Sequence, residues 1–197
     1  MDINFLRAAT EGEHRAAEKA MPILTEDLTL PAYVGTLEKL YGVVSGWEAV
    51  CETSAPAWMQ PMMRLRRRAS LLKQDLQFLS PEFHVVPPPQ LPILLTDADV
   101  LGSMYVMEGS RLGGTLISRH VEKTLSLRSG QGNAYFRGAG AGTGQLWMEF
   151  LGVLRNQVPD VQTNEVIAAA NEMFRFFTAW MLNPPRKYLE NGRQDEL

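Results

Sequence analysis

The sequence predicts an all-α protein with a single hydrophobic core. Apolar residues recur every three to four positions over most of the chain, and no segment has a convincing strand pattern. One proline-rich and one glycine-rich stretch interrupt the helical pattern. The 197 residues fit one domain of ordinary size. We expect this domain to span 1–182 as a bundle of six or seven helices, followed by a polar, mobile tail at 183–197.

The first half of the chain contains three apolar stretches with helical spacing. The first, 2–20, has Asp2 or Asn4 as a candidate N-cap, and the second, 30–53, begins with a proline that suits a first helical turn. A third helix is expected over 59–79, with a buried stripe formed by Leu65, Leu72, Leu76 and Leu79. Five prolines within 81–92 then exclude both helix and central strand.

The second half is expected to contain one long helix and two shorter ones. Asp97 or Asp99 is a candidate cap for the long helix, which continues to about residue 127. Six glycines within 129–144 predict a flexible loop, and helices follow at 145–157 and 163–182.

Composition excludes several classes of partner. Hydrophobic residues make up 45% and charged residues 21% of the chain, and the net charge of −3 gives no basic field for nucleic acid. The single cysteine, Cys51, cannot form an internal disulfide, which suits a reducing compartment. Since no apolar run approaches the roughly 20 residues of a membrane span, we expect a cytoplasmic protein that binds neither membrane nor nucleic acid.

The stretch YVMEGSRLGGTLI at 105–117 reads as a helix that tolerates unusual glycines. Each glycine in a helix costs about 1 kcal/mol relative to alanine. Gly102, Gly109 and Gly113 fall on one helical face, so either a neighbouring helix or a planar ligand is expected to approach the backbone there. The pair Gly113 and Gly114 also predicts a kink.

A second unusual face lies on the first helix. Arg7, Thr10, His14 and Glu18 share this face, and Ala17 adjoins them. The face suits a flat apolar ligand within reach of the imidazole, and Glu18 is placed to accept a hydrogen bond from the other ring nitrogen. The same spacing is also typical of a surface histidine among solvated charges.

Together the two helices describe the walls of a slot. One wall would ligate a planar, metal-containing ligand, and the other would leave space for a diatomic molecule. Haem fits this description, because its iron is commonly held by a histidine while the opposite side of the pocket decides the chemistry.

Two motifs resemble those of the haem oxygenases, most closely the bacterial type associated with bacteriophytochromes. R-x-A-T-x-x-x-H-x-x-A-E at 7–18 is similar to the proximal helix of the family. Y-V-M-E-G-S-x-L-G-G at 105–114 is similar to the distal helix. The resemblance extends over roughly 4–182, and the order of the motifs in an all-helical setting makes the pair specific.

The resemblance implies a reaction and its participants. Haem would be both substrate and cofactor, cleaved with O2 to biliverdin, carbon monoxide and ferrous iron. The electrons would come from a ferredoxin, a flavodoxin or a reductase, and a bacteriophytochrome is a candidate user of the product.

The resemblance also implies roles for particular residues. His14 would be the axial iron ligand and Glu18 its hydrogen-bond partner. Gly109, Ser110 and Gly113 would form the catalytic distal wall. Arg7 would pair with a haem propionate, while the remaining pocket positions would be Thr10, Ala17, Phe174 and Phe177. For the two phenylalanines, ordinary core packing is an equally good interpretation.

Three positions depart from the family pattern. Ser110 stands where many members carry an aspartate, and a hydroxyl supplies no fixed negative charge. Val44 stands where many carry a tyrosine. The helix after the glycine-rich stretch has no basic residue before Arg155, which leaves Arg7 as the main propionate anchor, with Arg137 as a second candidate.

Other basic residues leave alternatives open. Arg64, Arg66, Arg67 and Arg68 form a cluster with three interpretations: a solvated helix face, a docking site for an acidic electron donor, or a positive charge that steers the anionic propionates. Arg111, Arg119 and His120 are expected to face solvent, and His84 lies in the proline-rich loop. Alternative functions are a haem-binding protein without turnover on the same scaffold, and a helical-bundle relative for another planar ligand, such as a thiamin-pathway or quinone-cofactor protein.

Overall fold

The computed structural model describes residues 1–83 and 90–182, and it is helical throughout with no strand in those ranges. Seven helices have 11 or more residues, namely α1 (Ile3–Lys19), α2 (Leu30–Ser54), α4 (Ala69–Leu79), α5 (Asp97–Gly109), α6 (Gly114–Thr124), α8 (Thr143–Gln157) and α9 (Thr163–Leu182). Two short helices, α3 (Gln60–Leu65) and α7 (Ala134–Arg137), and two 3₁₀ turns (Gly140–Gly142 and Asp160–Gln162) complete the set. The all-α prediction is confirmed, while the tail at 183–197 lies outside the described residues.

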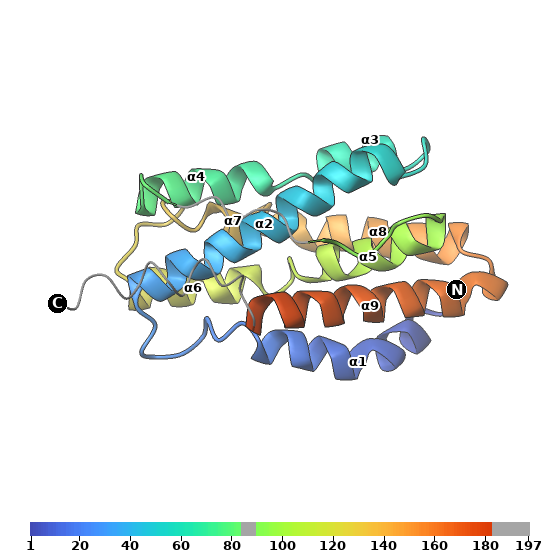
Figure 1. The fold of residues 1–197 in the computed structure, drawn as a ribbon, viewed down its shortest axis with the longest axis horizontal. Coiled ribbons are helices and arrows are strands. Elements are labelled where there is room, and N and C mark those ends of the chain that lie inside the picture. The colour runs from blue at the N-terminus through green and yellow to red at the C-terminus, as the bar shows by residue number, and fades with distance from the viewer. Residues whose placement is uncertain (84–89, 183–197) are drawn as a thin grey trace.

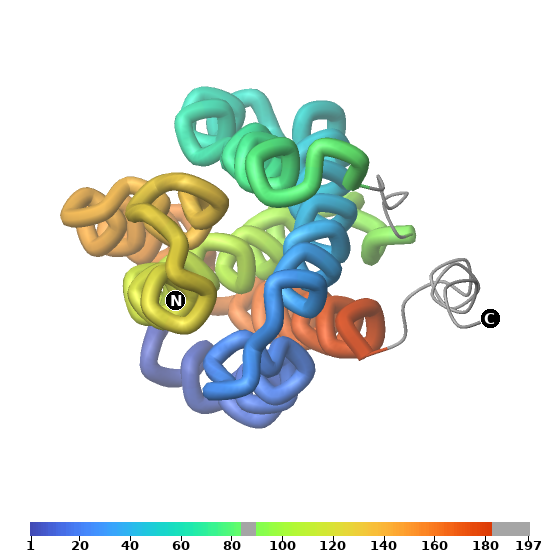
Figure 2. Tube along the Cα trace, turned by 90° about the vertical axis from the view of Figure 1, so that its left-hand side faces the viewer, coloured from blue at the N-terminus to red at the C-terminus, as the bar shows by residue number. Residues whose placement is uncertain are grey.

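Helix α5 lies at the centre of the bundle. It packs along α9, which in turn packs along α1, and Figures 1 and 2 both show α1 and α9 side by side. Helices α2, α3 and α4 cover the opposite side in Figure 1. Ten of the 13 residues of α5 are buried, which explains why its sequence is apolar on every face.

The helices at both ends of the chain begin and end close to the predicted residues. The Asp2 side chain caps α1, accepting a 2.8 Å hydrogen bond from the backbone N–H of Asn4. Helix α2 has Pro31 in its first turn, as its sequence predicts. The cap predicted for α5 is wrong, because Thr96 occupies that position and Asp99 completes a capping box from inside the helix.

The single helix predicted over 59–79 is wrong, because the chain breaks between α3 and α4. Glu48 of α2 accepts hydrogen bonds from the backbone N–H groups of Arg68 and Ala69 at 2.7 and 3.0 Å, and this carboxylate caps the start of α4. Leu72 and Leu76 are buried as predicted, but Leu65 is 84% exposed because it lies on the other side of the break.

The long helix predicted from about residue 97 to 127 is also two helices. Between α5 and α6, the N–H groups of Arg111, Leu112 and Gly114 bond to carbonyls three residues back instead of four. The chain therefore passes through a tight 3₁₀-like turn at 110–113. The predicted kink lies at the correct place, but it is a complete break in the helix. We refer to residues 109–113 as the distal turn.

Helix α7 lies inside the glycine-rich stretch that was predicted to be a flexible loop. Its residues Tyr135 and Phe136 are buried. The buried carboxylate of Asp75 accepts hydrogen bonds from the N–H groups of Ala134 and Tyr135, both at 2.8 Å. Tyr33 donates from its hydroxyl to the carbonyl of Gly132 at 2.9 Å. Helix α7 is thus held by buried polar groups of α2 and α4.

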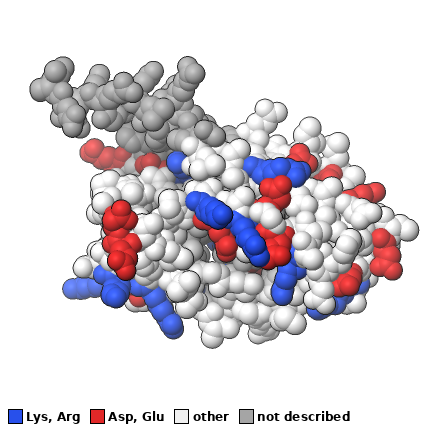
Figure 3. All heavy atoms as spheres, turned by 90° about the horizontal axis from the view of Figure 1, so that it is seen from below, with Lys and Arg blue, Asp and Glu red and all other residues white. Residues whose placement is uncertain are grey.

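The exposed surface carries both signs of charge. Figure 3 shows acidic and basic side chains interspersed on the face that carries α1, with no continuous patch of one sign on that face. This agrees with the small net charge of −3. In the described part of the chain, no helix is long and apolar enough to span a bilayer.

Candidate functional site

A cavity of about 680 Å³ lies between α1 on one side and α5 with the distal turn on the other. Its size is typical of a site for a drug-sized or cofactor-sized ligand. Its lining includes all ten residues that the sequence indicated as site residues, which are Arg7, Thr10, His14, Ala17, Glu18, Gly109, Ser110, Gly113, Phe174 and Phe177. The structure therefore brings residues together that are up to 170 positions apart in the chain.

The α1 wall presents one group that is able to bind a metal, the imidazole of His14. The His14 side chain is 53% exposed, and its Nε2 atom lies 3.6 Å from Oε1 of Glu18. This distance joins the two groups electrostatically but is longer than a hydrogen bond. The imidazole packs edge-on against the buried Phe174 of α9, with ring centroids 5.6 Å apart. One ring nitrogen faces the carboxylate, which leaves the other for a metal.

The remaining predicted positions on α1 contribute shape and one charge. Ala17 is buried, and Thr10 is buried with its hydroxyl donating to the carbonyl of Leu6 at 2.9 Å. The hydroxyl of Thr10 is thus used by its own helix. Arg7 is exposed while it lines the cavity, which is a suitable position for binding an acidic group at the entrance.

The distal wall shows that the glycines serve two different purposes. A Cβ atom on Gly102 would lie 2.5 Å from the carbonyl oxygen of Val166, and one on Gly114 would lie 2.3 Å from that of Phe136. These two glycines permit close packing of α9 and α7. In contrast, a Cβ on Gly113 would meet nothing within 4 Å, and one on Gly109 would only touch Trp147 at 3.8 Å. Backbone at these two positions forms the cavity wall.

Ser110 is fixed by two hydrogen bonds. Its Oγ donates to the carbonyl of Met107 at 2.8 Å and accepts from Nη2 of Arg68 at 2.6 Å. Nη2 of Arg68 also donates to the Met107 carbonyl at 2.6 Å. Because Arg111 bonds one residue further along, the Met107 carbonyl has lost its usual helical donor, and these two side chains replace it.

The predicted arginine cluster divides into two exposed residues, Arg64 and Arg67, and two buried ones. Arg66 and Arg68 are 5% and 6% exposed. Arg66 bonds to Oε2 of Glu108 at 2.9 Å and to Glu149 at 3.2 Å. Arg111, predicted to face solvent, is 12% exposed and its Nε lies 2.9 Å from Oε1 of Glu108. Since spacing within one helix carries no information about α5, these buried ion pairs were missed.

Aromatic residues missing from the sequence prediction complete the walls. Tyr105, Trp147, Tyr135 and Phe136 all line the cavity, and the rings of Tyr105 and Trp147 are 5.6 Å apart. Residue type alone did not distinguish these aromatics from core residues. The pair at 135 and 136 did carry a signal, because two large aromatics within a glycine-rich stretch indicate a buried anchor. Val44 is buried and lines the cavity without offering a polar group.

His120, Arg119 and Arg137 do not line the cavity. His120 is half-buried instead of fully solvent-facing, and its Nε2 lies 2.9 Å from the carbonyl oxygen of Thr25. Arg119 is exposed as predicted, and Arg137 is not among the cavity residues. His84 lies outside the described residues. Within the described ranges, no group of three or more His, Cys, Asp or Glu residues is placed to bind a metal, so metal binding here would rest on a single side chain.

Comparisons with known proteins agree with this architecture. A family model described as Heme oxygenase matches residues 95–183, which include α5, the distal turn and α9. A heme oxygenase of Xanthomonas campestris pv. campestris (strain 8004) is 30% identical over 149 residues, which cover 74% of this chain and 86% of that protein. The solved structure of heme oxygenase from Leptospira interrogans superposes with a TM-score of 0.71 at 21% identity, covering 91% of this chain and 97% of that one.

The structural match establishes the fold, and the sequence match extends through most of both chains. The chain therefore belongs to the haem oxygenase family.

Proposed function

We propose that this protein binds haem in the 680 Å³ cavity and cleaves it oxidatively to biliverdin, carbon monoxide and ferrous iron. When bound, haem supplies the iron that activates O2 and also the ring that is oxidised. Electrons would come from an external donor such as a ferredoxin, a flavodoxin or a reductase. The chain's own part in this proposal is to hold the ring, bind the iron from one side and control hydrogen bonding on the other.

One observation carries the proposal: the two walls of the cavity differ in kind. The α1 wall presents the imidazole of His14, and the distal wall presents backbone at Gly109 and Gly113. A flat ligand ligated by His14 would meet no side chain at those two glycines. The residues present fit haem, because the site combines one nitrogen ligand, a largely apolar lining and the open cavity beside Gly113.

The Glu18 carboxylate would orient the ligand. With a metal on one ring nitrogen, the other nitrogen keeps its proton and donates toward the carboxylate, 3.6 Å from Nε2 in this structure. Such a partner fixes the tautomer and raises the basicity of the ligating nitrogen. The edge-on contact with Phe174 limits rotation of the ring from the other side.

On the distal side, Ser110 would act as a hydrogen-bond acceptor. A hydroxyl has one proton and two lone pairs. Its proton is used by the Met107 carbonyl, and one lone pair is used by Arg68, which can only donate. A water molecule bound to the remaining lone pair must donate its proton to Ser110. Arg68 thereby makes Ser110 the acceptor in its hydrogen bond with the water. An aspartate at this position would accept from the water because of its negative charge.

Haem titration tests the proposal. Hemin is added to the purified protein, the Soret band is recorded, and ascorbate or a ferredoxin system is then supplied in air. We expect stoichiometric binding followed by conversion to a biliverdin spectrum. Failure to bind hemin stoichiometrically would refute the proposal. His14→Ala is expected to change the axial-ligand spectrum and stop normal turnover, whereas Arg119→Gln, an exposed residue outside the cavity, is the matched control.

A second candidate function is haem binding without turnover. It is favoured by Val44 and Ser110, because the cavity has an apolar residue and a neutral hydroxyl at positions where many family members carry a tyrosine and an aspartate. The same titration distinguishes the two functions, since a stable haem complex without bilin formation indicates the second. A bacteriophytochrome as user of the product and a cytoplasmic location remain predictions.

A further inference from the structure

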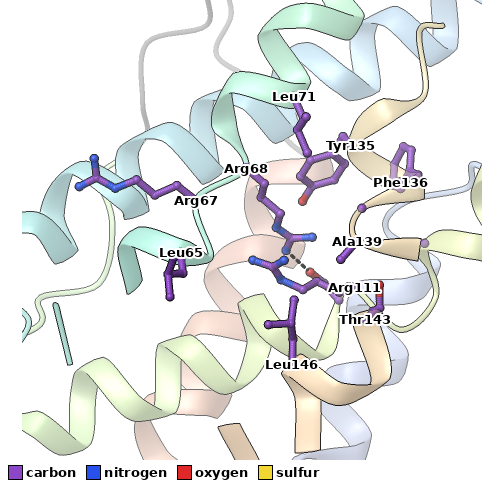
Figure 4. A pocket seen from close by; sticks show the side chains of 13 residues that line it. Leu65, Arg67, Arg68, Leu71, Arg111, Tyr135, Phe136, Ala139, Thr143 and Leu146 are labelled. Carbon is purple, nitrogen blue, oxygen red and sulfur yellow. Dashed lines mark hydrogen bonds between the residues drawn. The ribbon is translucent and has the colours of Figure 1, made fainter. Parts of the chain in front are cut away.

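A second, smaller cavity of about 230 Å³ lies behind the distal turn, on the side away from α1. It is bounded by the α3–α4 break, by α7 and by the start of α8, and Figure 4 shows it from close by. Arg68 and Arg111 enter it side by side, and the two guanidinium groups face the same space. Leu65, Leu71 and Leu146 line the remainder, so a cationic region adjoins an apolar one.

The ion pairs around this cavity leave one arginine out. Arg66 and Arg111 share the Glu108 carboxylate, and Arg66 also binds Glu149. Arg67 is paired with Glu52 at 3.0 Å. Arg68 forms no ion pair with any residue in the described part of the chain. The nearby Glu48 carboxylate accepts hydrogen bonds from the backbone N–H groups of Arg68 and Ala69, so the buried guanidinium of Arg68 is left without an ion-pair partner among the described residues.

The contacts of Arg68 do not compensate its charge. Its side chain donates only from Nη2, and both acceptors, the Met107 carbonyl and the Ser110 hydroxyl, are neutral. The guanidinium lies 4.6 Å from the centroid of the Tyr135 ring, and this cation–π contact supplies no counter-charge. Buried charges in proteins are usually paired, and an unpaired one is costly.

The positive charge of Arg68 also affects the pKa of Arg111. Burial lowers the pKa of its guanidinium, and the nearby positive charge of Arg68 lowers that pKa further, more than Glu108 raises it. An anion between the two arginines would remove this repulsion. The open side of Arg68 and the cavity volume provide the space for one.

We propose that this second cavity is a binding site for a small carboxylate, held between Arg68 and Arg111 with its short apolar part against the leucines. Guanidinium groups bind carboxylates through two parallel hydrogen bonds, a geometry that a planar anion matches. The volume of about 230 Å³, about a third of that of the haem cavity, suits a small ligand. The site is separate from the haem cavity, although Ser110, Tyr135 and Phe136 line both.

Sodium acetate is the probe that tests this site, because its methyl protons can be observed by saturation-transfer difference NMR. The protein is used without haem, so the result does not depend on the proposed function. We expect a saturable signal from the wild type. Arg68→Gln removes the uncompensated charge and should weaken acetate binding at least tenfold, as expected for losing a charge-assisted hydrogen bond.

Two further variants make the test specific. Arg64→Gln removes a charge from the same segment, but Arg64 is exposed and does not line the cavity, so acetate binding should be unchanged. Ser110→Asp places a carboxylate beside Arg68 and should also weaken acetate binding at least tenfold. This variant keeps the test informative if circular dichroism shows that Arg68→Gln does not fold. The proposal is overturned by a wild-type signal that does not saturate, or by equal binding in the wild type and Ser110→Asp.

Discussion

At the scale of single residues, the glycines between 102 and 114 are of two kinds. Some permit close packing of a neighbouring helix, and others form the cavity wall. The spacing of Gly102 and Gly113 predicted one shared helical face, but α5 ends at Gly109 and Gly113 lies in the distal turn. A side chain at Gly102 would press against Val166, whereas one at Gly113 would enter open cavity, and spacing alone could not distinguish the two purposes. The difference depends on α9, which lies more than 50 residues away in the sequence.

Substitution at these two glycines should therefore affect different properties, namely the free energy of unfolding at Gly102 and haem binding at Gly113. Gly102→Ala forces a methyl group against α9 and should lower the free energy of unfolding by about 1–3 kcal/mol. Gly113→Leu should leave the stability of the haem-free protein nearly unchanged, because Gly113 has a φ of −75° that any residue adopts and a Cβ there meets nothing within 4 Å. It should nevertheless weaken haem binding at least tenfold, because the side chain enters the cavity. Urea unfolding and hemin titration measure the two effects, with Gly113→Ala as the smaller control.

Ser110→Asp should stabilise the protein. The desolvation of Arg68 has already occurred in the folded state, so a carboxylate beside it adds attraction at little further cost for the arginine. We expect the melting temperature to rise by about 3–6 °C, which corresponds to roughly 1–2 kcal/mol in a domain of this size. Calorimetry of the haem-free variant measures it. A lower melting temperature would show that Arg68 is already compensated.

At the scale of elements, the short helix α7 has only four residues, yet its Tyr135 and Phe136 line both cavities. Asp75 fixes its first turn through two backbone hydrogen bonds. Burial raises the pKa of Asp75, and the two bonds from Ala134 and Tyr135 oppose that rise by favouring the ionised form. The carboxylate thus orders a segment whose own sequence is too short and too glycine-rich to form a stable helix.

Asp75→Asn should loosen α7. An amide replaces one acceptor oxygen with a donor group, so one of the two N–H groups loses its partner in a buried place. We expect a loss of about 1–3 kcal/mol in the free energy of unfolding. Faster amide hydrogen exchange at residues 134–137 should accompany it, while exchange in α1 should change little. Equal exchange rates in wild type and variant would contradict this role of Asp75.

The elements that sequence analysis predicted correctly are those with local signals. Helices α1, α2, α8 and α9 are each predicted by apolar residues that recur at helical spacing within the helix itself. This signal does not depend on contacts with distant segments. The breaks at 66–68 and 110–113 were missed or underestimated because each depends on distant groups. At the first break, the Glu48 carboxylate accepts a hydrogen bond from the backbone N–H of Arg68. At the second, Arg68 donates to the Met107 carbonyl, which has lost its helical donor. No pattern within either segment records those partners.

At the scale of the whole molecule, two buried ionisable groups lower the free energy of unfolding at alkaline pH. Burial, together with the charge of Glu48, raises the pKa of the Cys51 thiol to about 12, and burial also raises the pKa of Tyr33. Both groups stay neutral in the folded protein, but in the unfolded chain they ionise near pH 9 and 10. The unfolded state therefore binds fewer protons above pH 9, and stability falls as pH rises.

We expect the free energy of unfolding to be about 3–4 kcal/mol lower at pH 11 than at pH 8 from these two groups. Urea unfolding at the two pH values measures the difference. Cys51→Ala should remove more than half of that difference, because the thiol ionises at the lower pH. An identical pH dependence in the variant would show that Cys51 is accessible to water.

The contact between His14 and Phe174 has a consequence for the newly made chain. His14, the proposed iron ligand, lies on α1, which leaves the ribosome well before α9, the last described helix and the one that carries the Phe174 ring. Synthesis must pass residue 174 before the imidazole is held in place. If His14 ligates haem as proposed, a nascent chain cannot bind haem in the finished geometry, and the site would take up reactive iron only after the distal wall has also been made.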